Sequence, residues 1–177
     1  MSETLKPDVQ FEEQNITSTP ELAADAATTE IIEQNKVDLD NGRFANMKQS
    51  LLDRLMLDEN RIENIAKACE KLVALDDPVG QIESGSVRPN GMKITKVRVP
   101  MGVVGIIYQA RPNVTVDAAA LCLKSGNAVI LRGGKEAYNT NLALEKALRA
   151  ALIKVGLDGE LVSLVHDTTR EGSNTLM

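Results

Sequence analysis

The sequence predicts an α/β protein, with a Rossmann-like parallel sheet flanked by helices and an extended β-hairpin arm ahead of it. Short apolar runs alternate with helical patterns between Val103 and Val165, which is typical of strands joined by crossover helices. A turn signal at 88–91 separates two extended segments. The 177 residues are 43% apolar, which suffices for one packed domain.

Composition excludes several classes of protein. A net charge of −5 without a basic cluster argues against nucleic-acid binding. No stretch approaches the roughly 18 apolar residues that span a bilayer, and the N-terminus lacks a signal-peptide pattern. Cys69, Cys122 and His166 show no metal-ligand spacing, so we expect neither a disulfide framework nor a metal site. We therefore expect a cytoplasmic protein.

The first 79 residues divide into two predicted segments. Residues 1–28 are polar and we predict a mobile tail, although a helix entered at Pro20 is the alternative. Residues 29–79 are a helical lead-in, in which Asp58 caps a helix that ends at Asp77-Pro78. The apolar stripe of that helix predicts Cys69 as a buried packing residue; the stripe comprises Ile62, Ile65, Ala66, Cys69, Leu72 and Val73.

Residues 80–99 are predicted to form a β-hairpin arm. Arg88-Pro89-Asn90-Gly91 is a turn sequence, because proline presets φ and Asn-Gly tolerates the tight geometry that follows. The second strand mixes apolar and basic residues. Such a hairpin is an exposed arm or pairs with a partner's sheet edge, which makes it a candidate oligomerisation element.

Residues 100–177 are predicted to form a partial α/β domain with right-handed crossovers. Strands are expected at 103–108, 128–131 and 161–165, the first of them buried on both faces. The first helix should be capped by Asn113 or Thr115 and end at Gly126. The second helix should span 142–155 and end at Gly156, with Leu144, Leu148, Leu152 and Val155 on one face.

Ligands of parallel sheets bind beyond the carboxyl ends of the strands, which here carry "YQARPN" and "RGGKEA". Arg132 and Lys135 bring two cations, and Gly133 and Gly134 let the backbone approach a phosphate or ribose. An ordinary loop whose glycines only turn the chain fits equally well. The Rossmann fingerprint G-x-G-x-x-G is absent.

The stretch "VRVPMGVVGIIYQARPNVTVDAAALCLKSGNAVILRGGKEA" closely resembles the gamma-glutamyl phosphate reductase family, a branch of the aldehyde dehydrogenase superfamily. The likeness extends back through "LLDRLMLDENRIENIA", "DPVG" and "RPNG", and forward to about Asp167. It implies an aldehyde dehydrogenase-like cofactor domain. It also implies NADPH-dependent reduction of L-glutamyl 5-phosphate to glutamate 5-semialdehyde in proline biosynthesis.

The resemblance also implies roles for individual residues. NADP would be bound by Arg132, Gly133, Gly134, Lys135 and Glu136. Asn113 lies near the position of the superfamily's oxyanion-hole asparagine, and Arg111 is a candidate for the substrate's carboxylate or phosphate. Cys122 belongs to the helix of the cofactor domain, and the family's nucleophilic cysteine lies downstream of the matched segment.

We therefore expect the N-terminal part of such an enzyme, inactive by itself. Two alternatives stay open: a non-catalytic nucleotide-binding or dimerisation module that uses the 80–99 hairpin, and an α/β domain without a ligand. A parallel sheet of three strands has open edges, so we also expect self-association as a homo-oligomer.

Overall fold

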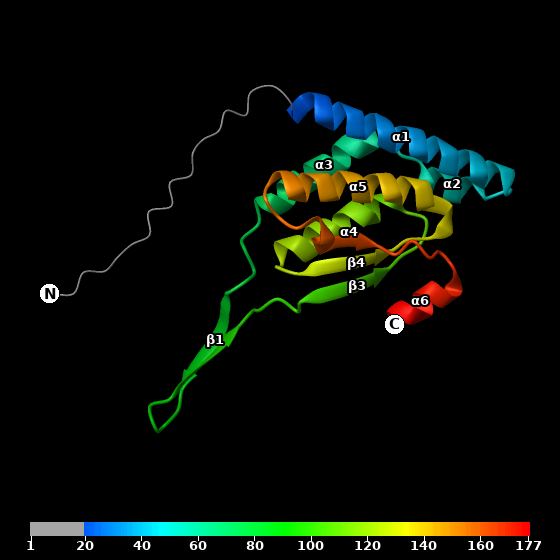
Figure 1. Ribbon diagram of the computed structural model, residues 1–177. Coiled ribbons are helices and arrows are strands. Elements are labelled where there is room, and N and C mark those ends of the chain that lie inside the picture. The colour runs from blue at the N-terminus through cyan, green and yellow to red at the C-terminus, as the bar shows by residue number, and fades with distance from the viewer. Residues whose placement is uncertain (1–19) are drawn as a thin grey trace.

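The computed structural model of the protein describes residues 20–177, with side chains described from Ala26 onward. It contains a helical layer, a parallel sheet and a hairpin that projects from both (Figure 1). The predicted fold class is confirmed. In the described part of the chain, no helix is both long and apolar enough to cross a membrane.

Three helices precede the hairpin. They are α1 (Pro20–Phe44), α2 (Gln49–Leu55) and α3 (Glu59–Val73). Helix α1 is the helix that the sequence allowed from Pro20, and it begins inside the segment for which a tail was predicted; residues 1–19 of that segment lie outside the described residues. Asp58 caps α3 as predicted, because its carboxylate accepts a hydrogen bond from the Arg61 amide at 2.8 Å.

The apolar stripe of α3 is less buried than the sequence predicts. Ile62, Ile65 and Cys69 are half-buried against a cluster that includes Val116 of α4 (Pro112–Lys124). Ala66 and Val73 are exposed, and Val73 keeps 76% of its surface accessible. Helix α3 packs at the margin of the domain, mainly against α4 and less against α1, and these contacts leave part of the stripe uncovered.

The predicted hairpin is present and fully exposed. Strands β1 (Ile82–Val87) and β2 (Lys93–Val97) pair antiparallel around the predicted turn, with a bulge between Ile82 and Ser84. Glu83 on β1 forms ion pairs with Lys96 at 2.5 Å and with Arg98 at 2.9 Å. The arm extends away from the helices and the parallel sheet (Figure 1).

The second half of the chain has the predicted β-α-β-α-β order. Its strands are parallel in the order β3-β4-β5. Gly126 and Gly156 adopt the left-handed φ values of 74° and 78° that end α4 and α5. The elements are β3 (Val103–Ile107), α4 (Pro112–Lys124), β4 (Ala128–Arg132), η1 (Lys135–Ala137), α5 (Tyr138–Lys154), η2 (Gly159–Leu161), β5 (Val162–Leu164) and α6 (Arg170–Leu176).

Three local predictions in this half are wrong. Strand β3 is an edge strand and is not buried on both faces: Val103 keeps 62% of its surface accessible, and Ile107 is exposed. Helix α4 starts at Pro112, whose fixed φ suits the first helical position, so Asn113 and Thr115 lie inside the helix and do not cap it. Val155 is exposed beyond the end of α5.

The main core lies between the sheet and helices α4 and α5 (Figure 1). Helix α6 lies on the other side of the sheet, where Leu176 would make van der Waals contact with a Cβ atom at Gly105. The fully or nearly buried members of this core are Ala118, Ala119, Cys122, Val129, Leu131, Leu152, Val162 and Leu164.

A buried carboxylate on α1 caps helix α5. Asp38 is 2% exposed, and its Oδ2 atom accepts hydrogen bonds from the Thr140 amide at 2.8 Å and the Thr140 hydroxyl at 2.6 Å. Its Oδ1 atom accepts from the amide and the side chain of Asn139. Ala137, at the N-cap position, has no side chain that could do this. Asp38 therefore fixes the start of α5.

We predict that Asp38→Ala lowers the free energy of unfolding by about 2–4 kcal/mol, because buried donors of α5 lose a charged acceptor. Urea denaturation measures the change. Asp40→Ala is the matched control on the same helix: Asp40 is exposed and pairs only with Arg43, so a change within about 0.5 kcal/mol is expected. Equal effects of the two substitutions would contradict the capping role.

Candidate functional site

A cavity of about 1170 Å³ opens at the carboxyl ends of β3 and β4, where the topology predicts ligand binding. We call it the strand-end pocket. Its walls come from the α1–α2 connection and α2, the segment after β3, the loop after β4, and the start of α6. The charged residues that line it are Arg54, Arg111, Arg132, Lys135, Glu136 and Arg170.

The strand-end pocket is basic in an acidic protein. Five of its six charged lining residues are cations, whereas the whole chain has a net charge of −5. Arg54, Arg111 and Arg170 have no acidic partner among the described residues. Outside the strand-end pocket, four of the five described arginines form an ion pair with an acidic residue: Arg43, Arg61, Arg98 and Arg149. The fifth, Arg88 at the hairpin turn, does not do so within the described part of the chain.

Arg132 joins the end of β4 to the start of α6. One terminal nitrogen donates to the carbonyl oxygens of Thr168 at 2.5 Å and Thr169 at 2.9 Å, and the other donates to Gly133 O at 3.1 Å. Its Nε atom is buried and has no hydrogen-bond partner within the described chain. The guanidinium is thus a structural link as well as part of the pocket wall.

The two glycines after β4 have different surroundings. Gly134 lines the pocket, and a Cβ atom there would lie 2.6 Å from a Glu136 carboxylate oxygen and 3.3 Å from the Ala110 amide. Gly133 is not among the lining residues: it is buried, and a Cβ atom would overlap the side-chain amide of Asn141. Both positions therefore require close backbone approach, as expected for glycine.

A chain of buried and half-buried hydrogen bonds leads to Asn141, which lies against Gly133 in the loop after β4. The Tyr108 hydroxyl lies 2.7 Å from the Thr115 hydroxyl, which donates to Asn141 Oδ1 at 2.8 Å. Burial raises the pKa of the Tyr108 phenol to about 12, against the smaller opposing effect of its bond to Thr115. The neutral phenol is therefore the form that the folded state favours.

Asn113 lies in a different cavity from Arg111. A smaller pocket of about 310 Å³ lies between α3 and α4, and its walls include Arg54, Arg61, Asn64, Asn113 and Asp117. We call it the helix pocket. There Asn113 Nδ2 donates to Asp117 Oδ2 at 3.2 Å, while Arg111 is exposed on the strand-end pocket. Of the predicted site residues, Arg111, Arg132, Gly134, Lys135 and Glu136 share one cavity.

Sequence reasoning missed Arg54 and the segment Thr168–Arg170. The segment follows β5, so the rule that found the ends of the two preceding strands would have found it as well. Arg54 carried no usable signal. It lies on an amphipathic helix of the lead-in, and only the packing of α2 against α1 and Ala137 brings it to the pocket.

The fold, a parallel sheet flanked by helices, is similar to that of aldehyde dehydrogenases. No family model matches the chain. A propionaldehyde dehydrogenase from Rhodopseudomonas palustris superposes with a TM-score of 0.50 at 17% identity, over 85% of this chain and 39% of that one, which concerns the fold alone.

The particular relatives are gamma-glutamyl phosphate reductases. The protein from Clostridium novyi is 51% identical over 150 residues, and that from Clostridium perfringens 53% identical over 148 residues. The crystal structure of the Thermotoga maritima enzyme matches with a TM-score of 0.80 at 43% identity, over 85% of this chain and 36% of that one. The Saccharomyces cerevisiae enzyme matches with a TM-score of 0.72 at 31% identity, over 83% and 38%.

The chain is therefore similar in sequence and fold to a portion of gamma-glutamyl phosphate reductase, in agreement with the resemblance that its motifs carry. It spans 36% of the length of the curated relatives from the two Clostridium species, which themselves match 85% and 84% of this chain.

We predict that Gly133→Ala lowers the free energy of unfolding by about 1–3 kcal/mol, because the new methyl group must displace Asn141. Chemical denaturation measures it. Gly85→Ala in the hairpin is the control, since a Cβ atom there has only ordinary contacts, the nearest at 3.6 Å. A tolerated alanine at 133 would show that the loop is not closely packed.

Ionisation of Tyr108 should destabilise the fold at high pH. The folded-state pKa of about 12 exceeds the usual value of 10.0, so stability contributed by this phenol is complete below pH 10 and lost as pH rises toward 12. Comparing the free energy of unfolding of the wild type and Tyr108→Phe across this range isolates the effect. Parallel pH profiles would contradict the assignment.

Proposed function

We propose that the strand-end pocket binds the adenosine and phosphate portion of a nicotinamide dinucleotide, with NADP as the preferred form. The observation that carries this proposal is the unbalanced charge of the pocket, where five cations and one carboxylate face a common space. An anion with several charges is the ligand that such a wall favours, because each contact with a basic side chain is a charge-assisted hydrogen bond.

Individual residues have complementary roles in this proposal. Lys135 is exposed at the start of η1 and supplies a positive charge for a phosphate on the ribose. The Glu136 carboxylate accepts hydrogen bonds from ribose hydroxyl groups. Gly134 keeps the wall free of a side chain, while Arg132 holds the Thr168–Thr169 backbone in place and adds charge.

We further propose that the enzyme to which this chain corresponds reduces L-glutamyl 5-phosphate to L-glutamate 5-semialdehyde with NADPH and releases phosphate. The names of the similar reductases support the reaction class. Arg111 is proposed to bind the substrate's carboxylate or phosphate. Asn113, whose amide donates to Asp117, is proposed as the oxyanion donor.

The chain alone is proposed to lack turnover, because neither of its two cysteines fits a nucleophilic thiolate. Cys122 is buried among core side chains, and desolvation raises its pKa. Desolvation also raises the pKa of Cys69, and the nearby Asp117 raises it further. Reactive cysteines have the opposite property, a lowered pKa beside positive charge.

Calorimetric titration of the 177-residue chain with NADP+ and NAD+ tests the cofactor proposal. Lys135→Ala should weaken NADP+ binding about tenfold through the loss of one charge-assisted contact. Lys154→Ala is the control at the far end of α5, and it should leave the Kd unchanged. Unchanged NADP+ affinity in Arg132→Ala combined with Lys135→Ala would exclude the assigned wall.

A second candidate function is dimerisation through the hairpin. Its apolar residues have no cover within the described chain: Ile82, Val87, Met92, Ile94 and Val97 are all exposed. A two-stranded ribbon is marginal in water by itself, and both of its edges offer free backbone groups to another sheet.

We expect sedimentation velocity to detect a homo-oligomer whose population rises with concentration. Ile94→Lys should shift the distribution toward the monomer, because it adds charge to the uncovered hairpin. Ile153→Lys is the control, since Ile153 is the same apolar residue, is even more exposed than Ile94, and lies on α5. A monodisperse wild-type monomer would exclude this function.

A further inference from the structure

We propose that Arg54 binds a phosphate group of the ligand at the point where the strand-end pocket meets the helix pocket. This inference rests on the proposed function and adds a residue to it. Arg54 is the one residue that lines both the cavity of about 1170 Å³ and the cavity of about 310 Å³, as far as the described chain shows. Arg54 is exposed and borders both cavities.

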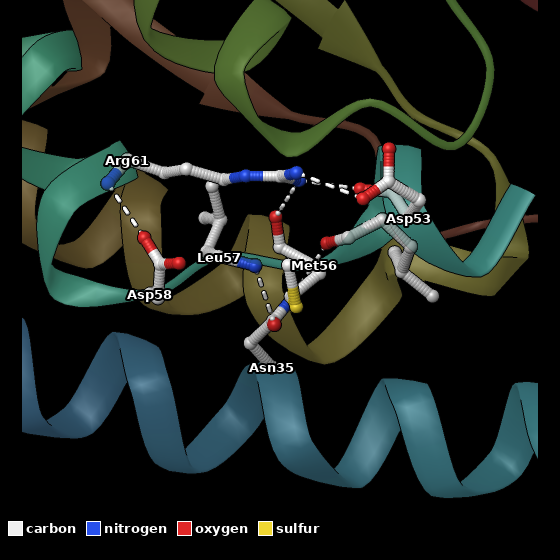
Figure 2. A network of polar contacts seen from close by, with 7 residues as sticks. Asn35, Asp53, Met56, Leu57, Asp58 and Arg61 are labelled. Carbon is white, nitrogen blue, oxygen red and sulfur yellow. Dashed lines mark hydrogen bonds and ion pairs between the residues drawn. The ribbon is translucent and has the colours of Figure 1, made fainter. Parts of the chain in front are cut away.

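The acidic group nearest in sequence is already occupied. Asp53 Oδ1 accepts a hydrogen bond from Arg61 Nη2 at 2.9 Å, and Arg61 Nη1 also donates to Met56 O at 2.9 Å (Figure 2). Arg54 has no ion pair or side-chain hydrogen bond within residues 20–177. Two consecutive residues of α2 thus differ: Asp53 forms a solvent-exposed ion pair with Arg61, whereas Arg54 lines both cavities without an acidic partner among the described residues.

The backbone that carries Arg54 is held rigidly. Leu55 is fully buried, and the Asn35 side chain on α1 donates to Leu55 O at 2.8 Å. The same side chain accepts a hydrogen bond from the Leu57 amide at 2.7 Å (Figure 2). Because the helix end is fixed on this side and by Arg61 on the other, Arg54 loses only side-chain freedom when it binds.

The chemistry of the two cavities points to phosphate. A guanidinium forms paired hydrogen bonds with phosphate oxygens, and Arg111, Arg132, Lys135 and Arg170 share the larger cavity with Arg54. The helix pocket adds the amide side chains of Asn64 and Asn113, which can accompany a polar ligand group. The phosphate can belong to the dinucleotide or to the phosphoryl group of the small acyl phosphate.

The experiment compares Arg54→Gln, Arg54→Lys and the control Arg88→Gln, an arginine at the hairpin turn that also lacks an acidic partner among the described residues. Calorimetry gives the Kd of each variant of the 177-residue chain for NADP+, NAD+ and inorganic phosphate. Arg54→Gln should raise at least one Kd about tenfold, Arg54→Lys should restore part of the loss, and Arg88→Gln should match the wild type. Urea denaturation checks that all variants remain folded.

The pattern identifies the phosphate. Weakened NADP+ binding with unchanged NAD+ binding assigns the phosphate on the ribose, and equal weakening assigns the pyrophosphate. An effect on inorganic phosphate alone assigns the phosphoryl group of the small substrate. If Arg54→Gln binds all three probes like the wild type, the inference is overturned while the proposed function stands. If the wild type binds neither dinucleotide, the proposed function fails. In that case the role of Arg54 is overturned as well if the wild type does not bind inorganic phosphate, or if Arg54→Gln binds it with an unchanged Kd.

Discussion

The Asp38 carboxylate is the contact on which the site depends most. The loop after β4 must turn into α5 within a few residues, and the N-cap position of α5 is an alanine that leaves the first amides without a local acceptor. Asp38 reaches these amides from α1, about one hundred positions earlier in the chain, and it is almost completely buried there. The favourable interaction of a carboxylate with a helix N-terminus offsets the desolvation of its charge.

The contact of Asp38 with α5 links the helical lead-in to the part of the α/β unit that forms the strand-end pocket. Helix α1 fixes α5 through Asp38, and it fixes the end of α2 through Asn35, whose amide also donates to Thr140 at 3.2 Å. One helix thus sets two walls of the strand-end pocket: the loop that leads to α5, and α2 with Arg54. The lead-in therefore shapes the strand-end pocket and is not simply a cover for the sheet.

Local sequence patterns predicted the helices, strands and turns better than they predicted how buried each element is and what it contacts. The Asp58 cap, the turn at Arg88–Gly91 and the parallel strand order follow from turn chemistry and periodicity, and they are confirmed. The apolar run of β3 predicted burial on both faces, but exposure depends on what packs against a strand. The caps and walls contributed by Asp38 and Arg54 arise from contacts across the chain, which no window of sequence reveals.

The arrangement of charge distinguishes the pocket from the rest of the surface. Acidic residues outnumber basic ones in the chain, and those near most other arginines form ion pairs with them. Among the described residues that line the strand-end pocket, Glu136 is the only acid, so the cations repel one another. Water in an open cavity screens that repulsion only partly. A bound anion with several negative charges would offset the repulsion between these cations. Ligand binding therefore explains the uncompensated charge, which the packing of the protein does not require.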